Sequence, residues 1–289
     1  MHSFVVGYIA LAALLGLLIG SFLNVVIHRL PQMMEQQWDD ECAQHQAHKA
    51  GLEQSSAAPT ITLSSPRSRC PHCSHPIAWY ENIPVISWLL LRGKCKACKQ
   101  GISVRYPLVE IVCSLLFAWC VHHWGWSASA WVWCGFSATL LTLAMIDWDT
   151  TYLPDSLTLP LLWAGLLATS LGWTGITLSS SLWGAAVAYL SLWSIYWVFK
   201  MLTGKEGMGY GDFKLFAALG AWFGWQALIP MILMASVIGA IIGIVMKFNS
   251  KLREGGYIPF GPFLAGAGFA AMLFGSENIL SPFLNALSG

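Results

Sequence analysis

The sequence has 289 residues, of which 56% are hydrophobic and only 10% are charged, and its mean hydropathy is +0.59. So few charged side chains exclude a soluble globule of this size, whose surface needs far more polar area. The net charge of +1 also argues against nucleic acid as a partner, because nucleic-acid-binding domains are usually strongly basic. Most of the chain is therefore expected to lie in membrane lipid.

Eight apolar segments have about the length that a spanning helix requires, which is roughly 20 residues. With the sixth the shortest, the predicted spans are 4–27, 106–124, 128–146, 156–173, 180–200, 213–225, 227–247 and 257–275. No basic residue precedes the first span, which is predicted to stay in the membrane as an anchor and not to be cleaved as a signal peptide.

The positive charges indicate the orientation. Threading eight spans places all 15 Lys and Arg residues on one side, in 28–105, 200–214 and 247–253. By the positive-inside rule that side is the cytoplasm, so the N-terminus is predicted to be periplasmic. The basic residues between Arg92 and Arg105 are expected to meet anionic lipid headgroups.

Three parts follow in chain order. Residues 1–28 are predicted as the first transmembrane helix, where Gly16 and Gly20 form a GxxxG pattern that lets another helix approach closely. Residues 29–105 form a polar cytoplasmic insert, whose first half is interpreted as a loosely ordered or helical linker. Residues 106–289 hold the other spans.

The second half of the insert carries two C-x-x-C pairs, Cys70 with Cys73 and Cys95 with Cys98, separated by 21 residues. This spacing predicts a structural zinc site with four thiolate ligands. Disulfides are the alternative, but the predicted cytoplasmic position disfavours them. The predicted fold class is thus an all-α polytopic membrane protein of about eight transmembrane helices with a small cytoplasmic zinc-binding insert.

Carboxylates at the ends of apolar spans are costly and are therefore functional candidates. Asp147 and Asp149 end the third predicted span, and Asp155 begins the fourth. Asp155 is interpreted as a helix N-cap. Asp147 has no such explanation, because the helix macrodipole disfavours an anion at a helix C-terminus.

Asp212 follows a glycine-rich loop with Gly207, Gly209 and Gly211, whose lack of side chains permits close approach of another group. Tertiary packing is able to bring Asp212 to Asp147, since both are predicted at the cytoplasmic boundary. Two adjacent carboxylates share one proton and so supply both a base for water and an acid for a carbonyl group. The residues alone leave helix caps or a proton relay open as alternatives.

Several ordered motifs identify a resemblance over nearly the whole chain. They are GSFLNVVIHRLP at Gly20–Pro31, RSRCPHC, NIPVISWLLLRGKCKAC, RYPLVE, IDWDTTYLPD and GYGDFKL. Together they resemble the type IV prepilin peptidase family, whose members are bifunctional leader peptidases and N-methyltransferases.

The resemblance implies that Asp147 and Asp212 are the catalytic aspartates, with Asp149 and Asp155 in supporting or capping roles. It implies cleavage of short basic leaders from prepilins and pseudopilins at the cytoplasmic face of the bacterial inner membrane. Methylation of the new N-terminal residue, usually phenylalanine, would follow with S-adenosylmethionine as donor. Gly93 matches a glycine associated with methyl transfer, and Glu110 is a further candidate, although no Rossmann-type GxGxxG segment is present.

Two other functions are compatible with acids at the ends of spans and with paired cysteines. A secondary transporter would place acids near the bilayer midplane and show inverted repeats, which the sequence lacks. A zinc-dependent membrane scaffold would use the cysteine pairs to recruit a partner and the aspartates only to cap helices. A metallopeptidase is disfavoured because no HExxH motif is present.

Overall fold

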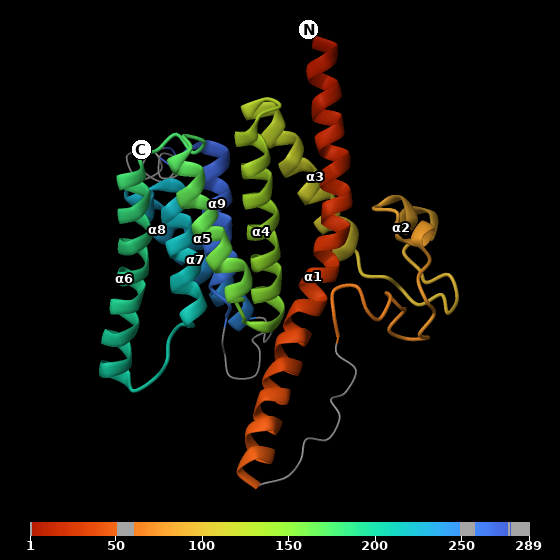
Figure 1. Ribbon diagram of the computed structural model, residues 1–289, viewed down its shortest axis with the longest axis horizontal. Coiled ribbons are helices and arrows are strands. Elements are labelled where there is room, and N and C mark those ends of the chain that lie inside the picture. The colour runs from red at the N-terminus through yellow and green to blue at the C-terminus, as the bar shows by residue number, and fades with distance from the viewer. Residues whose placement is uncertain (1, 51–60, 249–257, 277, 279–289) are drawn as a thin grey trace. The chain divides into compact units, whose positions relative to one another are not determined.

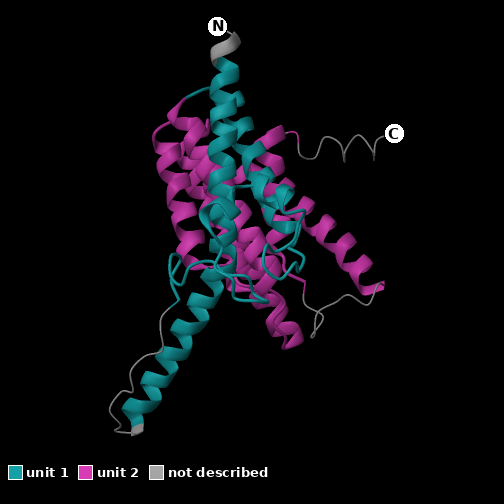
Figure 2. Ribbon diagram, turned by 90° about the vertical axis from the view of Figure 1, so that its right-hand side faces the viewer, with its two compact units in different colours: residues 1–126 teal, residues 127–289 magenta. Residues whose placement is uncertain are grey.

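The structure is a computed structural model that describes residues 2–50, 61–248, 258–276 and 278. Within these residues it contains helices and two isolated β-bridges but no β-strand (Figure 1). The chain forms two compact units, Met1–Trp126 and Ser127–Gly289 (Figure 2). The all-α fold class predicted from the sequence is confirmed.

The first unit is built on two long helices, α1 (His2–Ala50) and α3 (Arg105–Trp124), which pack along each other (Figure 1). Gly16 and Gly20 of α1 lie at this contact, and a Cβ atom at either position would lie 2.7 Å from a Cα atom of α3. The predicted close approach at the GxxxG pattern is therefore found, and α3 is the partner.

Helix α1 is longer than the predicted first span. The first span is predicted to end near residue 27 and to be followed by a loosely ordered or helical linker, and the structure has the helical form, because α1 continues through Pro31 to Ala50. The polar residues after the apolar run are good helix formers. A helix that leaves the lipid can therefore continue into water until a residue that favours a helix end is reached. The segment from 61 to 104, called the cysteine segment below, holds η1 (Trp79–Asn82) and α2 (Ile86–Leu90).

The compact units divide the chain at 126/127, whereas the sequence suggested 105/106. The difference is α3, which packs on α1 and so belongs with the cysteine segment.

Among the residues that the structure describes, the second unit contains seven helical elements. They are α4 (Ala128–Thr150), α5 (Asp155–Ser170), α6 (Leu178–Thr203), α7 (Tyr210–Phe223), η2 (Trp225–Ala227), α8 (Leu228–Phe248) and α9 (Gly261–Phe274). Helix α7 is the core of the unit, because it packs against α5, α6 and α9 and buries almost all of its side chains (Figure 1). At its crossing with α6 the backbones of Gly220 and Gly184 are in direct contact, which no larger residue would allow.

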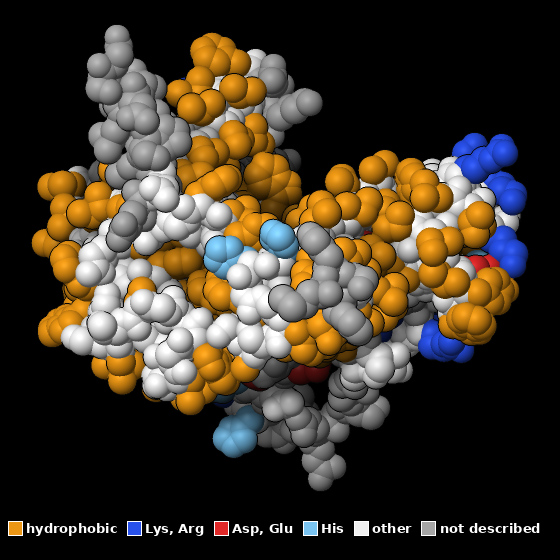
Figure 3. All heavy atoms as spheres, turned by 90° about the horizontal axis from the view of Figure 1, so that it is seen from above, with side chains coloured by type: hydrophobic (Ala, Val, Ile, Leu, Met, Phe, Trp, Pro, Cys, Tyr) orange, Lys and Arg blue, Asp and Glu red, His pale blue; other side chains and the backbone are white. Residues whose placement is uncertain are grey.

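Within the described part of the chain, five helices are long and apolar enough to cross a membrane, namely α1, α3, α4, α6 and α8 with its preceding η2. In the most apolar stretch of 18 residues of α6, and likewise of α8, only 22% is buried inside the protein, so the apolar side chains of these two helices are mostly exposed. Figure 3 shows hydrophobic side chains on much of the face it presents. Helices of this kind are stable when lipid surrounds them. Helices α5, α7 and α9 occupy the other three predicted spans but are shorter.

Candidate active site and metal centre

Asp147 lies in the last turn of α4 and is only 4% exposed. The backbone N–H of Gly261, the first residue of α9, donates a hydrogen bond of 2.9 Å to Asp147 Oδ2. The partial positive charge at the N-terminus of α9 compensates for the unfavourable C-terminus of α4. A Cβ atom at position 261 would lie 2.6 Å from Oδ2, so the contact requires glycine.

Asp212 is the third residue of α7 and is 7% exposed. Its Oδ2 accepts a 3.2 Å hydrogen bond from the N–H of Gly209. Its Oδ1 is buried and has no hydrogen-bond partner among the residues that the structure describes. Because buried polar atoms are nearly always paired, this oxygen is available to a water molecule or a substrate.

The structure brings the two aspartates together. Both carboxylates are buried within the second unit. Leu153 lies next to a neighbour of each acid. A Cβ atom built at Gly211, which precedes Asp212, would lie 2.6 Å from Leu153, and one built at Gly261, which binds Asp147, would lie 3.3 Å from it. Both acids stand at helix ends, and neither lies in the middle of a helix.

The other two acids are arranged differently. Asp149 is exposed on α4. Asp155 was predicted to be an N-cap, but Pro154 occupies that position and Asp155 lies inside the first turn of α5. Its carboxylate instead accepts two hydrogen bonds from Lys214 Nζ, at 2.6 and 2.7 Å, so the capping prediction is wrong. An acid in the first turn still interacts favourably with the helix dipole.

Sequence reasoning missed Gly261 as the partner of Asp147 and Lys214 as the partner of Asp155. Lys214 stands in the GYGDFKL motif beside Asp212, but no local pattern indicates which acid it meets. The only signal at Gly261 is its place before a proline at a helix start.

The four cysteines of the cysteine segment are free thiols whose Sγ atoms all lie within 4.8 Å of one another. The Sγ atoms of Cys70 and Cys98 are 3.8 Å apart, and those of Cys73 and Cys95 are 4.0 Å apart. Tetrahedral zinc with Zn–S bonds of about 2.3 Å requires sulfur separations of about 3.8 Å. A disulfide requires about 2.05 Å, so the arrangement fits a metal.

The two cysteine pairs fold alike. After the second cysteine of each pair comes a residue in the left-handed region, Ser74 (φ 56°) or Lys99 (φ 62°). In each pair the N–H of that residue donates to the carbonyl oxygen of the first cysteine, at 2.9 and 3.0 Å. Backbone hydrogen bonds from Cys73 and His72 lower the pKa of Cys70 to about 6, whereas burial and the neighbouring thiols raise the pKa of Cys73 to about 11. Without a metal the four thiols therefore hold their protons unequally, and the thiolate that zinc binds is favoured at Cys70.

Gly93 has a positive φ of 65° and packs on the indole ring of Trp88. A Cβ atom at Gly93 would lie 2.9 Å from that ring. The indole nitrogen of Trp88 donates to the carbonyl oxygen of Ile102 at 3.1 Å, and the N–H of Ile102 donates to the carbonyl oxygen of Gly93 at 2.7 Å. The absence of a side chain at Gly93 therefore leaves room for the Trp88 ring in this position.

Comparison with known proteins agrees with this two-unit organisation. Residues 14–124 match the family model of the bacterial peptidase A24 N-terminal domain, and residues 134–244 match that of the type IV leader peptidase family. Each matched range lies within one of the compact units.

Relatives extend over nearly the full length. A protein of Stutzerimonas stutzeri named prepilin leader peptidase/N-methyltransferase is 53% identical over 270 residues, which are 93% of this chain and 92% of that protein. Proteins of the same name from Pseudomonas aeruginosa and Aeromonas hydrophila are 48% and 49% identical, covering 96% and 93% of this chain and 94% and 92% of their own lengths. No solved structure matches the chain.

Proposed function

The chain belongs to the type IV leader peptidase family, and from this premise we propose that Asp147 and Asp212 are the catalytic dyad with which it removes the leader of prepilins. The chain is a membrane aspartic endopeptidase and an N-methyltransferase. The dyad rests on the buried Oδ1 of Asp212, which has no hydrogen-bond partner among the described residues, and on Leu153, which lies against the glycines next to both acids.

The chemistry requires one proton on the pair. The ionised carboxylate takes a proton from water as the water oxygen attacks the scissile carbonyl carbon, and the protonated carboxyl group hydrogen-bonds to the carbonyl oxygen. The carbon–nitrogen bond then breaks, and the leaving amine takes up a proton. The N–H groups of Gly261 and Gly209 hold one oxygen of each acid in place. The shared proton belongs to the pair and not to either residue.

The test is leader cleavage of a co-expressed prepilin by Asp147→Asn and Asp212→Asn. Each variant is expected to lose at least about 1,000-fold in rate, equal to ~4 kcal/mol of transition-state free energy. Asp39→Asn is the control, because Asp39 is an exposed aspartate of α1 in the other unit. Normal cleavage by either dyad variant, at equal membrane accumulation, would remove that residue from the mechanism.

We further propose that Cys70, Cys73, Cys95 and Cys98 bind a structural zinc ion. One zinc ion bound by four thiolates would hold together two loops that bury few apolar side chains. Metal analysis of the purified protein is expected to find one zinc per chain, lost in a variant with all four cysteines changed to serine. Replacement of Cys42 by serine is the control, because Cys42 is an exposed free thiol outside both pairs.

For the second activity we propose S-adenosylmethionine as the methyl donor and the new N-terminal residue, usually phenylalanine, as the acceptor. The donor supplies an electrophilic methyl group. Gly93 is proposed to act in this reaction by positioning Trp88, with which it is in contact.

The substrate set is proposed to include pseudopilins as well as prepilins. The location is proposed as the bacterial inner membrane, with lipid around the spans. The N-terminus is proposed to lie in the periplasm and the active site at the cytoplasmic face. Nucleic acid is not proposed as a partner. The positions of the Lys and Arg residues support this orientation. Reporter fusions after Trp124 and after Thr203 test it, since the first should lie in the periplasm and the second in the cytoplasm.

Two observations favour a peptidase over the other candidates. Acids at helix ends do not suit a transporter site at the bilayer midplane. A scaffold has no use for an acid with an unpaired buried oxygen.

A further inference from the structure

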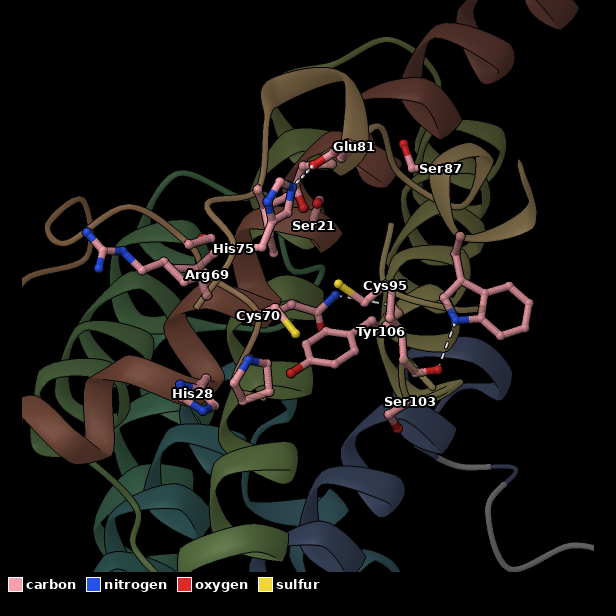
Figure 4. Close-up of a pocket in the computed structure, with 18 of the residues that line it drawn as sticks. Ser21, His28, Arg69, Cys70, His75, Glu81, Ser87, Cys95, Ser103 and Tyr106 are labelled. Atoms are coloured by element: carbon pink, nitrogen blue, oxygen red, sulfur yellow. Dashed lines mark hydrogen bonds and ion pairs between the residues drawn. The ribbon is translucent and has the colours of Figure 1, made fainter. Parts of the chain in front are cut away.

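The first unit contains a cavity of about 610 Å³. Its walls come from α1, from the cysteine segment and from α3. Figure 4 shows Ser21 of α1, Glu81 and Ser87 of the cysteine segment and Tyr106 of α3 around it. A volume of this size lies within the range of about 300–1,000 Å³ in which proteins bind small molecules. The dyad lies in the other unit, so the peptidase reaction does not explain this cavity.

The cavity is lined by two acids and by the basic side chains of Arg29, Arg67, Arg69 and Lys96, and of the two acids only Glu81 forms an ion pair among the described residues. Glu81 pairs with Lys96 Nζ at 3.1 Å and with His75 Nε2 at 3.4 Å. Glu110 is 7% exposed and accepts a 2.7 Å hydrogen bond from the N–H of Val85. No Lys, Arg or His forms an ion pair with Glu110 within the described part of the chain. A buried carboxylate without a counter-charge is costly, so a cationic ligand would stabilise it.

The loop that holds Glu110 is itself strained. Val85 has φ 57°, a region that a β-branched residue adopts only when its surroundings force it to. The Val85 N–H is directed to the carboxylate of Glu110, and the nearby hydroxyl of Ser87 accepts from the N–H of Ile83 and donates to the carbonyl oxygen of Tyr80. Strain of this kind is maintained where it serves function, and here it fixes one oxygen of Glu110 at the cavity wall.

We propose that this cavity binds the methyl donor S-adenosylmethionine, with the carboxylate of Glu110 facing one of the two cationic groups of that ligand. The inference rests on the N-methyltransferase activity of the chain. A sulfonium ion and an ammonium group are the cationic features of the donor, and the indole of Trp88 and the phenol ring of Tyr106 offer flat faces for its adenine.

The methyl transfer needs no further reactant. The neutral N-terminal amine of the cleaved substrate forms a bond to the methyl carbon while the carbon–sulfur bond breaks, and the electron pair of that bond stays on sulfur. The positive charge thus moves from sulfur to nitrogen. An α-amino group with a pKa of about 7.7–8.0 is partly neutral at physiological pH, so it loses its proton to water beforehand. Glu110 stabilises the positive charge and is not required as a base.

The test measures donor binding separately from activity. The full-length chain, purified in detergent, is equilibrated by dialysis with S-adenosylmethionine and in parallel with S-adenosylhomocysteine, which lacks the sulfonium charge. Glu110→Gln is expected to weaken binding of the donor at least 10-fold. Val25→Trp, which fills the cavity from α1, is expected to abolish binding. The control Glu41→Gln changes an exposed acid of α1 that does not line the cavity and should bind as the wild type does.

Comparing the two ligands shows which cationic group of the donor faces Glu110. Weaker binding of S-adenosylmethionine alone supports a contact with the sulfonium, and equal weakening of both ligands supports a contact with the ammonium group. Unchanged binding by Glu110→Gln overturns the role of Glu110, and unchanged binding by Val25→Trp overturns the cavity as the site. Zinc content and prepilin cleavage show whether each variant is folded. A wild-type chain that neither binds the donor nor methylates its product would overturn the methyltransferase function itself.

Discussion

Gly261→Ala is the perturbation that tests the geometry of the dyad most directly. The new Cβ atom would lie 2.6 Å from Asp147 Oδ2, whereas ordinary carbon–oxygen contacts exceed 3 Å, so the carboxylate or the start of α9 must move. The displacement breaks the 2.9 Å hydrogen bond from the N–H of residue 261. A hydrogen bond to a charged group contributes about 1.5–3 kcal/mol, which corresponds to a rate loss of about 10- to 150-fold.

The assay is the initial rate of prepilin cleavage in membranes that contain equal amounts of each variant. Gly266→Ala is the matched control, because it makes the same substitution in the same helix at a position with no neighbour within 4 Å. Alanine favours a helix over glycine by up to about 1 kcal/mol, and this control measures that effect alone. If Gly261→Ala cleaves as fast as Gly266→Ala, the amide of Gly261 does not position Asp147 during catalysis and the reasoning is refuted.

Three further outcomes are expected. Gly93→Ala should reduce methylation at least 10-fold while leaving cleavage intact, because its Cβ atom displaces Trp88; Gly125→Ala, with a similar φ of 68° but open space around it, should methylate normally in the same mass-spectrometric assay. The cleavage rate should be bell-shaped in pH, falling at low pH when both acids of the dyad are protonated and at high pH when both are ionised, whereas a plateau on either side would contradict a shared proton. Lys214→Met should change the free energy of unfolding by less than about 1 kcal/mol, because its ion pair with Asp155 is partly exposed; a much larger loss in a denaturant titration would show that the pair matters more than its exposure indicates.

Local features of the sequence were sufficient for much of the fold. A membrane-spanning helix satisfies its own backbone hydrogen bonds, so each apolar run predicts its helix without reference to any other segment. The two C-x-x-C pairs were equally informative, because a tetrahedral site admits few spacings and the four Sγ atoms do lie together. The length of α1 was not predictable in this way, since hydropathy reports where lipid ends and not where a helix ends.

The relations between distant segments had to come from the tertiary structure. Asp147 and Asp212 are 65 positions apart, and nothing in the pattern of either motif states that α4 and α7 bring them together. The backbone amide that donates to Asp147 belongs to Gly261, which lies 114 positions after Asp147 in the chain.

The same division holds for the first unit. The sequence by itself determined that Glu110 lies in an apolar helix and that Gly93 stands between the cysteine pairs. Only the packing of α3 on α1 and the turn of the cysteine segment decided that Glu110 faces a cavity and that Gly93 supports Trp88. The physical reason is that residue type and periodicity fix local conformation and burial, whereas which buried groups meet depends on how the helices pack.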